Sequence, residues 1–78
     1  MTIHIGNLNI MTTARQLAEL FRPFGNVSSS RIIAAGPKGR SNGSGLVEIE
    51  RFCGNRAVRM LHRQLFMNSY IDVKEVFV

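Results

Sequence analysis

The sequence predicts an α+β fold in which two helices cover one face of a four-stranded antiparallel sheet. Two observations lead to this prediction. Apolar residues change twice from the period of two of a half-buried strand to the spacing of three and four of an amphipathic helix. Clusters of glycine, proline, serine and asparagine separate these segments as turns. At 78 residues the chain suits a single domain, residues 1–78, with one compact core.

The first predicted strand is the segment TIHIG, residues 2–6. Ile3 and Ile5 alternate with His4, which is the pattern of a strand with one buried face. His4 is therefore expected to point away from the core.

The first helix is predicted to start at a capping box. Thr13 and Gln16 have the required spacing, in which each side chain bonds the backbone amide of the other. Pro23 and Gly25 are expected to end the helix. The apolar residues at helical spacing are Leu17, Leu20 and Phe21.

Two strands are predicted in the middle of the chain. Residues 26–35, NVSSSRIIAA, form the weaker one, with Val27 and Ile32 facing inward and Arg31 and Ile33 on the opposite face. The segment GPKGRSNG follows as a loop. The next strand is expected from about residue 43 to residue 50. Its inward residues are Gly45, Val47 and Ile49, and its outward residues are Ser44, Leu46 and Glu48.

The last third of the chain predicts a second helix and a fourth strand. The helix has a narrow apolar seam at Ala57, Val58 and Leu61. His62 is expected at its C-terminal end. In the strand, Ile71 and Val73 alternate with Tyr70, Asp72 and Lys74. Four phenylalanines are expected in the core or at its edge, because they lie on apolar stripes and turns: Phe21, Phe24, Phe52 and Phe66.

The resulting order, β-α-β-β-α-β, predicts the ferredoxin-like arrangement, with both helices packed on one face of the sheet. The other face is then open to solvent. Since this architecture serves unrelated activities, function has to be inferred from the residues of a site.

The charge distribution indicates a polyanionic partner. The net charge is +5, and eight of the ten lysines and arginines form two blocks that contain no acid. Clustered lysine and arginine raise the local potential and attract phosphates, although a solvated basic surface is the alternative. The first block contains Arg22, Arg31, Lys38 and Arg40. The second contains Arg51, Arg56, Arg59 and Arg63.

Several classes of protein are not favoured by the composition. The single cysteine, Cys53, excludes an internal disulfide and a paired-cysteine metal or redox site. The glycine-rich loop lacks the Gly-Lys-Ser/Thr of a nucleotide-binding loop. No apolar stretch approaches the roughly 20 residues that cross a bilayer, and no signal peptide is evident. We therefore expect a cytoplasmic protein that is not an enzyme, has no cofactor or metal, and does not bind a membrane.

Two segments resemble the signature motifs of the RNA recognition motif (RRM) family. Residues 3–8, IHIGNL, are similar to the family's hexapeptide, which reads apolar-aromatic-apolar-x-Asn-Leu. Residues 42–49, NGSGLVEI, fall on its octapeptide, in which aromatic residues flank the second glycine or alanine. The segment TARQLAELFRPFGNV resembles the family's first helix and turn. The resemblance covers nearly the whole chain and is nearest to short stand-alone bacterial RRM proteins.

The resemblance implies that single-stranded RNA lies across the open face of the sheet. His4 occupies a stacking position, but Ser44 and Leu46 stand where the octapeptide has aromatic rings. Each stacked base is worth about 1–3 kcal/mol, so binding is expected to be weak and of low sequence specificity. The expected RNA-binding residues are His4, Asn7, Arg31, Lys38, Arg40, Ser44, Leu46 and Lys74.

An alternative is a protein-interaction module with little or no RNA binding, centred on an apolar spot formed by Leu46 and Ile33. Arg56, Arg59 and Arg63, at i, i+3 and i+7, are expected to share one helical face that meets a second RNA strand, an acidic partner or only solvent. Tyr70 is either a stacking residue at the rim or an edge-packing residue. Phe77 either folds over the sheet, docks on the core or frays. The RNA target and the oligomeric state stay open.

Overall fold

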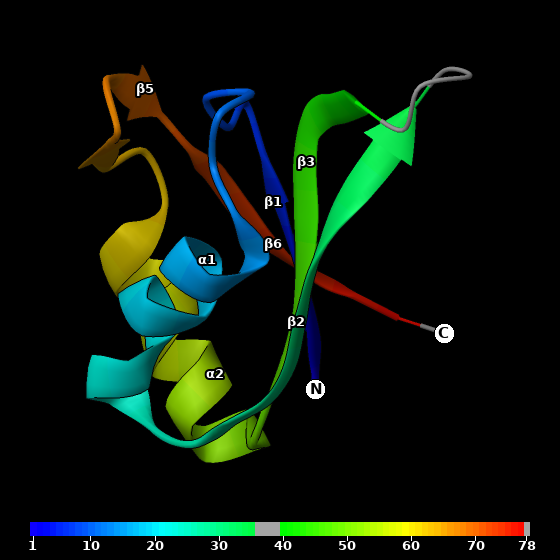
Figure 1. Ribbon diagram of the computed structural model, residues 1–78. Helices are drawn as coiled ribbons and strands as arrows, with labels where there is room; N and C mark the ends of the chain where they lie inside the picture. The colour runs from blue at the N-terminus through cyan, green and yellow to red at the C-terminus, as the bar shows by residue number, and fades with distance from the viewer. Residues whose placement is uncertain (36–39, 78) are drawn as a thin grey trace.

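The computed structural model describes residues 1–35 and 40–77, and it describes side chains outside residues 34–42 (Figure 1). The elements follow the predicted order, with two short additional strands. The strands are β1 (Thr2–Gly6), β2 (Val27–Ala35), β3 (Arg40–Ile49), β4 (Leu65–Phe66), β5 (Ser69–Tyr70) and β6 (Asp72–Val76). The helices are α1 (Ala14–Phe21), a 3-10 turn η1 (Arg22–Phe24) and α2 (Arg51–Leu61).

The main sheet has the strand order β2-β3-β1-β6, and every neighbouring pair is antiparallel. Both helices lie on the same side of this sheet, and its other side is uncovered by them (Figure 1). This arrangement confirms the predicted ferredoxin-like fold. The two strands that bear the signature motifs, β1 and β3, are adjacent at its centre.

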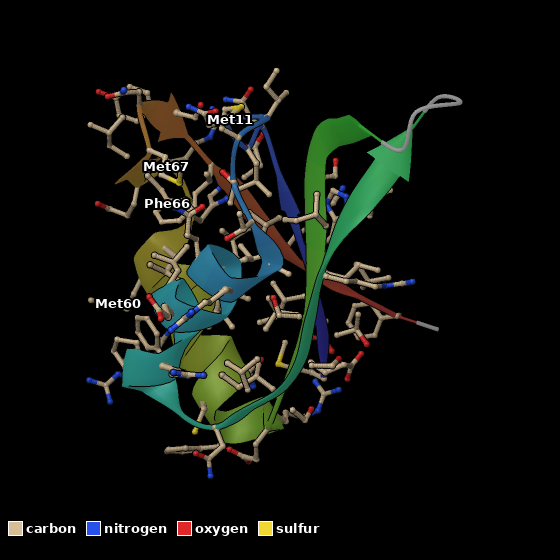
Figure 2. All side chains as sticks on the ribbon, viewed as in Figure 1. Met11, Met60, Phe66 and Met67 are labelled. Atoms are coloured by element: carbon tan, nitrogen blue, oxygen red, sulfur yellow. The ribbon has the colours of Figure 1, made fainter. Side chains whose placement is uncertain are left out.

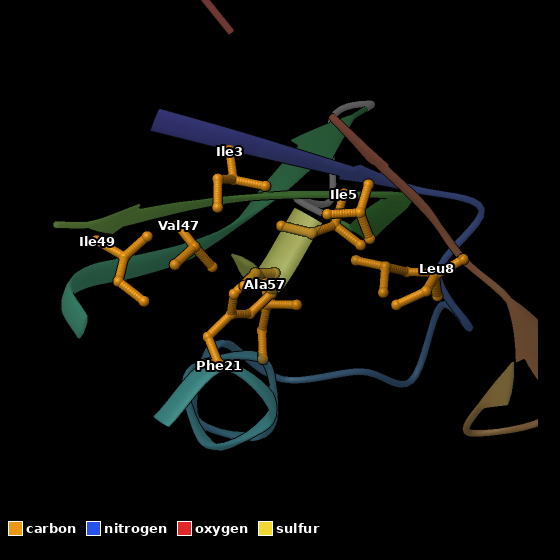
Figure 3. Packing of buried hydrophobic residues seen from close by; sticks show 10 residues of the cluster. Ile3, Ile5, Leu8, Phe21, Val47, Ile49 and Ala57 are labelled. Carbon is orange, nitrogen blue, oxygen red and sulfur yellow. The ribbon is translucent and has the colours of Figure 1, made fainter. Parts of the chain in front are cut away.

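The core lies between the sheet and the two helices, as Figure 3 shows. Alternation along β1 and β3 sends one set of apolar side chains into it, and each helix adds its buried stripe. The fully or nearly buried core residues are Ile3, Ile5, Leu8, Leu17, Phe21, Val47, Ile49, Ala57, Ile71 and Val73. The predicted inward residues of β1 and β3 are therefore confirmed.

The predicted capping box at the start of α1 is confirmed. The Gln16 amide donates to Thr13 Oγ1 at 3.1 Å, and the Thr13 amide donates to Gln16 Oε1 at 2.9 Å. These bonds satisfy amides that have no partner inside the helix. They fix the start of α1, the helix whose Leu17 and Phe21 side chains are buried in the core.

Helix α2 is held at both ends by side chains. At its start, the Glu50 carboxylate accepts from the amides of Phe52, at 2.9 Å, and Cys53, at 3.1 Å. The Phe52 amide bond, with the bonds from Cys53, lowers the pKa of Glu50 below that of an ordinary glutamate. At its end, His62 caps the helix as predicted, and its Nδ1 accepts from the Val73 amide of β6 at 3.0 Å.

Two predictions about α2 are wrong. Phe52 is 80% exposed, because the buried seam of the helix runs through Gly54 and Ala57 on the opposite side. Arg63 lies beyond the helix with a φ of 67°, and its Nε is 3.5 Å from Asp72 Oδ1. The three-arginine face is therefore reduced to two arginines within the helix.

The hairpin of β4 and β5 was not predicted. Its turn residues, Met67 and Asn68, both have positive φ, at 48° and 64°. Such turns usually show an Asn-Gly or Asp-Gly signal, which is absent here, and strands of two residues are too short to display alternation. Tyr70 consequently belongs to β5, and the last strand of the main sheet begins at Asp72.

A side chain added at Gly45 should destabilise the fold. A Cβ there would lie 2.6 Å from Leu17 Cδ2 and 3.0 Å from the Arg31 carbonyl oxygen, because α1 packs closely on β3. We expect Gly45→Val to lower the free energy of unfolding by about 1–3 kcal/mol in urea denaturation. Ser44→Val, one residue away on the opposite face, is the matched control and should change it by less than about 0.5 kcal/mol. Equal effects of the two variants would contradict the packing of α1 against Gly45.

The carboxylate of Glu50 should make stability depend on pH. Because its pKa is lowered in the folded chain, its contribution is present above the pKa of the unfolded chain, about 4.3, and is lost as the pH falls through the folded value. Glu50→Gln should therefore be less stable than the parent at pH 7, and the gap should narrow below about pH 4. Denaturant titrations at several pH values test this, and a gap that stays constant would contradict it.

Candidate functional site

The open face of the sheet is the candidate site. Strand alternation turns the side chains that are not in the core toward this face. The residues that face it from the two central strands are Thr2, His4, Gly6, Ser44, Leu46 and Glu48. The predicted outward positions of His4, Ser44 and Leu46 thus coincide with the face that the helices leave uncovered.

Four of the predicted site residues form a single row across all four strands. Arg31 on β2 pairs with Leu46 on β3, Leu46 pairs with His4 on β1, and His4 pairs with Lys74 on β6. With neighbouring strands about 4.8 Å apart, this row spans about 15 Å. We call it the central row. It places a cation at each edge of the sheet and an imidazole and an isobutyl group between them.

The two cations of the central row are available to a ligand. Arg31 and Lys74 are exposed, and in the described part of the chain neither has a carboxylate within ion-pair distance. His4 and Leu46 are half-buried. A Cβ at Gly6 would lie 3.5 Å from His4 Cε1, so the missing side chain at Gly6 leaves space beside the imidazole. The row therefore offers two positive charges around a flat ring.

A second row limits where an anion can lie. Glu48 on β3 pairs with Thr2 on β1, and the Thr2 hydroxyl donates to the Glu48 carboxylate. The neighbouring positions at the two edges are Ser29 and Val76. Because this row has a negative charge and no cation, phosphates are favoured on the central row and disfavoured beyond Glu48.

The other predicted site residues have different positions. Ser44 is half-buried on the same face, two residues from Leu46. Asn7 is exposed at the rim with a φ of 57°, and its Nδ2 donates to the Tyr70 carbonyl at 2.8 Å, so it ties β1 to the short hairpin. Arg40 begins β3 opposite Ala35. Lys38 lies outside the described residues.

Two exposed aromatic residues lie just before and just after β6. Tyr70, in β5, is 62% exposed, and its backbone carbonyl accepts from Asn7 Nδ2. Phe77 is 81% exposed, so it does not dock on the core. The chain leaves β6 on the side away from the helices (Figure 1). Sequence patterns could not decide these positions, because each residue lies at the end of a strand, where alternation gives no signal.

Residues 1–35 and 40–77 contain no group of three or more His, Cys, Asp or Glu side chains that could hold a metal ion. None of the helices in these residues is long and apolar enough to cross a membrane. Cys53 is a half-buried free cysteine. A hydrogen bond with Glu50 raises the pKa of its thiol, which disfavours the reactive thiolate at neutral pH.

Known proteins resemble this chain in both sequence and fold. A family model described as the RNA recognition motif matches residues 3–72. The crystal structure of RNA-binding protein PG1 is 35% identical, with a TM-score of 0.96 over 100% of this chain and 95% of that one. No curated protein gives a significant match.

Two structures of lower identity share the fold. The first two RNA recognition domains of Sex-lethal from Drosophila melanogaster are 24% identical, with a TM-score of 0.90 over 99% of this chain and 50% of that one. The Rna15 RRM with bound RNA (GU) is 20% identical, with a TM-score of 0.83 over 96% of this chain and 81% of that one. At these identities the likeness shows the fold alone.

Proposed function

The chain belongs to the RNA recognition motif family, and from this premise we propose that it binds single-stranded RNA across the open face of its sheet. The central row is the observation on which the proposal rests, because it joins two available cations and a histidine on one uncovered surface. The proposal is supported by the 35% identity to a protein described as RNA-binding. It is also supported by an RRM of the same fold that was solved with bound RNA.

In this proposal His4 stacks a base, and cations at the two edges of the sheet hold the RNA backbone. An imidazole has a flat face for stacking and a ring nitrogen that can donate a hydrogen bond. Arg31 and Lys74 flank it at the two edges of the sheet and contact phosphates. We propose Lys38 and Arg40 as further phosphate contacts and Asn7 as a rim contact.

The binding is proposed to be weak. At the octapeptide positions where the family stacks two bases, this chain presents Ser44 and Leu46, and neither has an aromatic ring. The missing stacks amount to roughly 2–6 kcal/mol, or about 30-fold to 10⁴-fold in affinity. Charge therefore supplies most of the available contacts.

Low sequence specificity follows from the same surface. Reading a base edge requires donors and acceptors held in fixed positions. On the central strands the outward polar side chains are few, and Thr2 and Glu48 already bond each other. Phosphate contacts do not distinguish one base from another. We propose that the site accepts many single-stranded sequences.

A protein-interaction module is the second candidate. The specific observation in its favour is the aliphatic side chain of Leu46 at the centre of the sheet, where a base would otherwise stack.

Four further expectations stay predictions. They are a single-domain organisation over residues 1–78, the lack of enzymatic activity, a bacterial origin and a cytoplasmic location.

RNA binding should depend steeply on salt. Four phosphate contacts, from Arg31, Lys38, Arg40 and Lys74, give a slope of log affinity against log salt of about −2.8 for a single strand. Fluorescence anisotropy with a labelled oligouridine between 50 and 300 mM salt (roughly the range in which such slopes are measured) would determine it. Tight binding that persists at high salt, or a slope near zero, would argue against a surface dominated by charge.

Completing the stacking platform should strengthen binding. The double variant Ser44→Tyr and Leu46→Phe adds two rings beside His4 without changing the inward residues of β3. One productive stack should tighten binding to short RNA about fivefold or more. Asn55→Tyr on α2 is the matched control, because it adds an exposed ring on the helix side, and it should leave affinity unchanged. If the folded double variant binds RNA no better than the parent, the protein-interaction module is the better account.

A further inference from the structure

We propose that the outward surface of α2 docks an acidic, apolar segment of a partner protein. This surface, which we call the α2 outer face, consists of Phe52, Arg56, Arg59 and Met60. It belongs to the helix layer, whereas the proposed RNA site lies on the opposite side of the sheet. The inference does not depend on RNA binding.

Helical geometry brings the four side chains onto one surface. At about 100° per residue, positions 52, 56, 59 and 60 fall within an arc of roughly 100°, and Gly54 and Ala57 lie on the buried side. Phe52 and Met60 are eight residues apart, which is about 12 Å along the axis. The two arginines lie between them. Figure 2 shows Met60 projecting outward on the helix side of the molecule.

The two apolar residues of the α2 outer face are not needed by the core. Phe52 is 80% exposed and Met60 is 58% exposed. The backbone amide of Phe52 takes part in the Glu50 cap, but its ring contributes nothing to that bond. A single exposed apolar residue is ordinary. Two on one short helical surface, including an aromatic ring, are typical of an interface, in which aromatic residues, methionine and arginine are enriched.

Among the residues that the structure describes, the two arginines of this face have no acidic partner. All five acidic side chains are engaged elsewhere: Glu19 with Arg15, Glu48 with Thr2, Glu50 with the α2 amides, Asp72 with Arg63, and Glu75 with Arg51. Arg59 lies in the last turn, where the helix dipole favours a cation. That explanation does not extend to Arg56 in the middle of the helix.

Charge complementarity identifies the occupant. Two cations with an apolar side chain at each end match a segment in which Asp or Glu lies between two apolar residues. A second copy of this chain would bring like charges together, because the net charge is +5. RNA phosphates would satisfy the arginines and leave Met60 in water. A lipid surface requires a more extended apolar face than two side chains provide.

Amide-shift mapping with the full chain tests the proposal. The probe is a pool of synthetic 15-residue peptides, long enough to span the face (roughly 22 Å as a helix), with Leu or Phe flanking central Asp and Glu residues. We expect shifts concentrated on residues 51–61. A matched pool with Asn and Gln in place of the acids should bind about threefold more weakly or worse.

Variants then distinguish peptide binding at the α2 outer face from RNA binding on the sheet. Phe52→Ser should weaken binding of the peptide about tenfold, and Arg56→Glu about threefold or more, with RNA affinity and melting temperature unchanged. Phe77→Ser is the matched control for the loss of an exposed aromatic ring, and it should leave peptide binding intact. Arg31→Glu should reduce RNA binding alone, so the two proposals can fail separately.

Three outcomes would overturn the inference. The first is an acidic pool that does not shift residues 51–61. The second is a larger shift of these residues with single-stranded RNA or phosphatidylserine vesicles than with the peptides. The third is self-association that Phe52→Ser abolishes, which would assign the α2 outer face to a second copy of the chain.

Discussion

The antiparallel register between β1 and β3 is the constraint on which both the core and the candidate site depend. It pairs Ile3 with Val47 on the side of the helices and His4 with Leu46 on the open side. Because side chains alternate, a slip of one residue would exchange the two sets and place His4 in the core. The apolar residues that stabilise the fold therefore also determine which residues a ligand meets.

Hydrogen bonds beyond both ends of β1 stabilise this register. At one end the N-terminal amino group of Met1 donates to the Ile49 carbonyl at 2.6 Å, and at the other the Leu8 amide donates to the Gly43 carbonyl at 2.8 Å. Between them, Gly45 permits α1 to lie close against β3. Gly45, a glycine of the octapeptide pattern, is therefore required for the packing of α1 on β3, independently of any ligand.

Alternation and capping signals were enough to predict the fold and the face on which His4, Ser44 and Leu46 lie. They could not predict that Arg31, Leu46, His4 and Lys74 form one row, because β2 has irregular pairing between Val27 and Ser29 and between Ile32 and Ala34. Each irregularity shifts the residues that oppose β3. The errors at Phe52 and Arg63 have a similar origin, since sequence spacing does not fix the rotation of a helix on its sheet or its last residue.

The two proposed surfaces have a joint consequence because they lie on opposite layers. A ligand on the central row and a segment on the α2 outer face can be bound at the same time, with the sheet between them. A partner that also binds RNA would make the second contact intramolecular, which can raise overall affinity by about 10² to 10⁴ without any new contact on the sheet. A gain of that size is comparable with the affinity that is lost because Ser44 and Leu46 cannot stack bases. The sheet then needs to hold the RNA backbone only loosely, and the specificity of the assembly belongs to the partner that the helix layer selects.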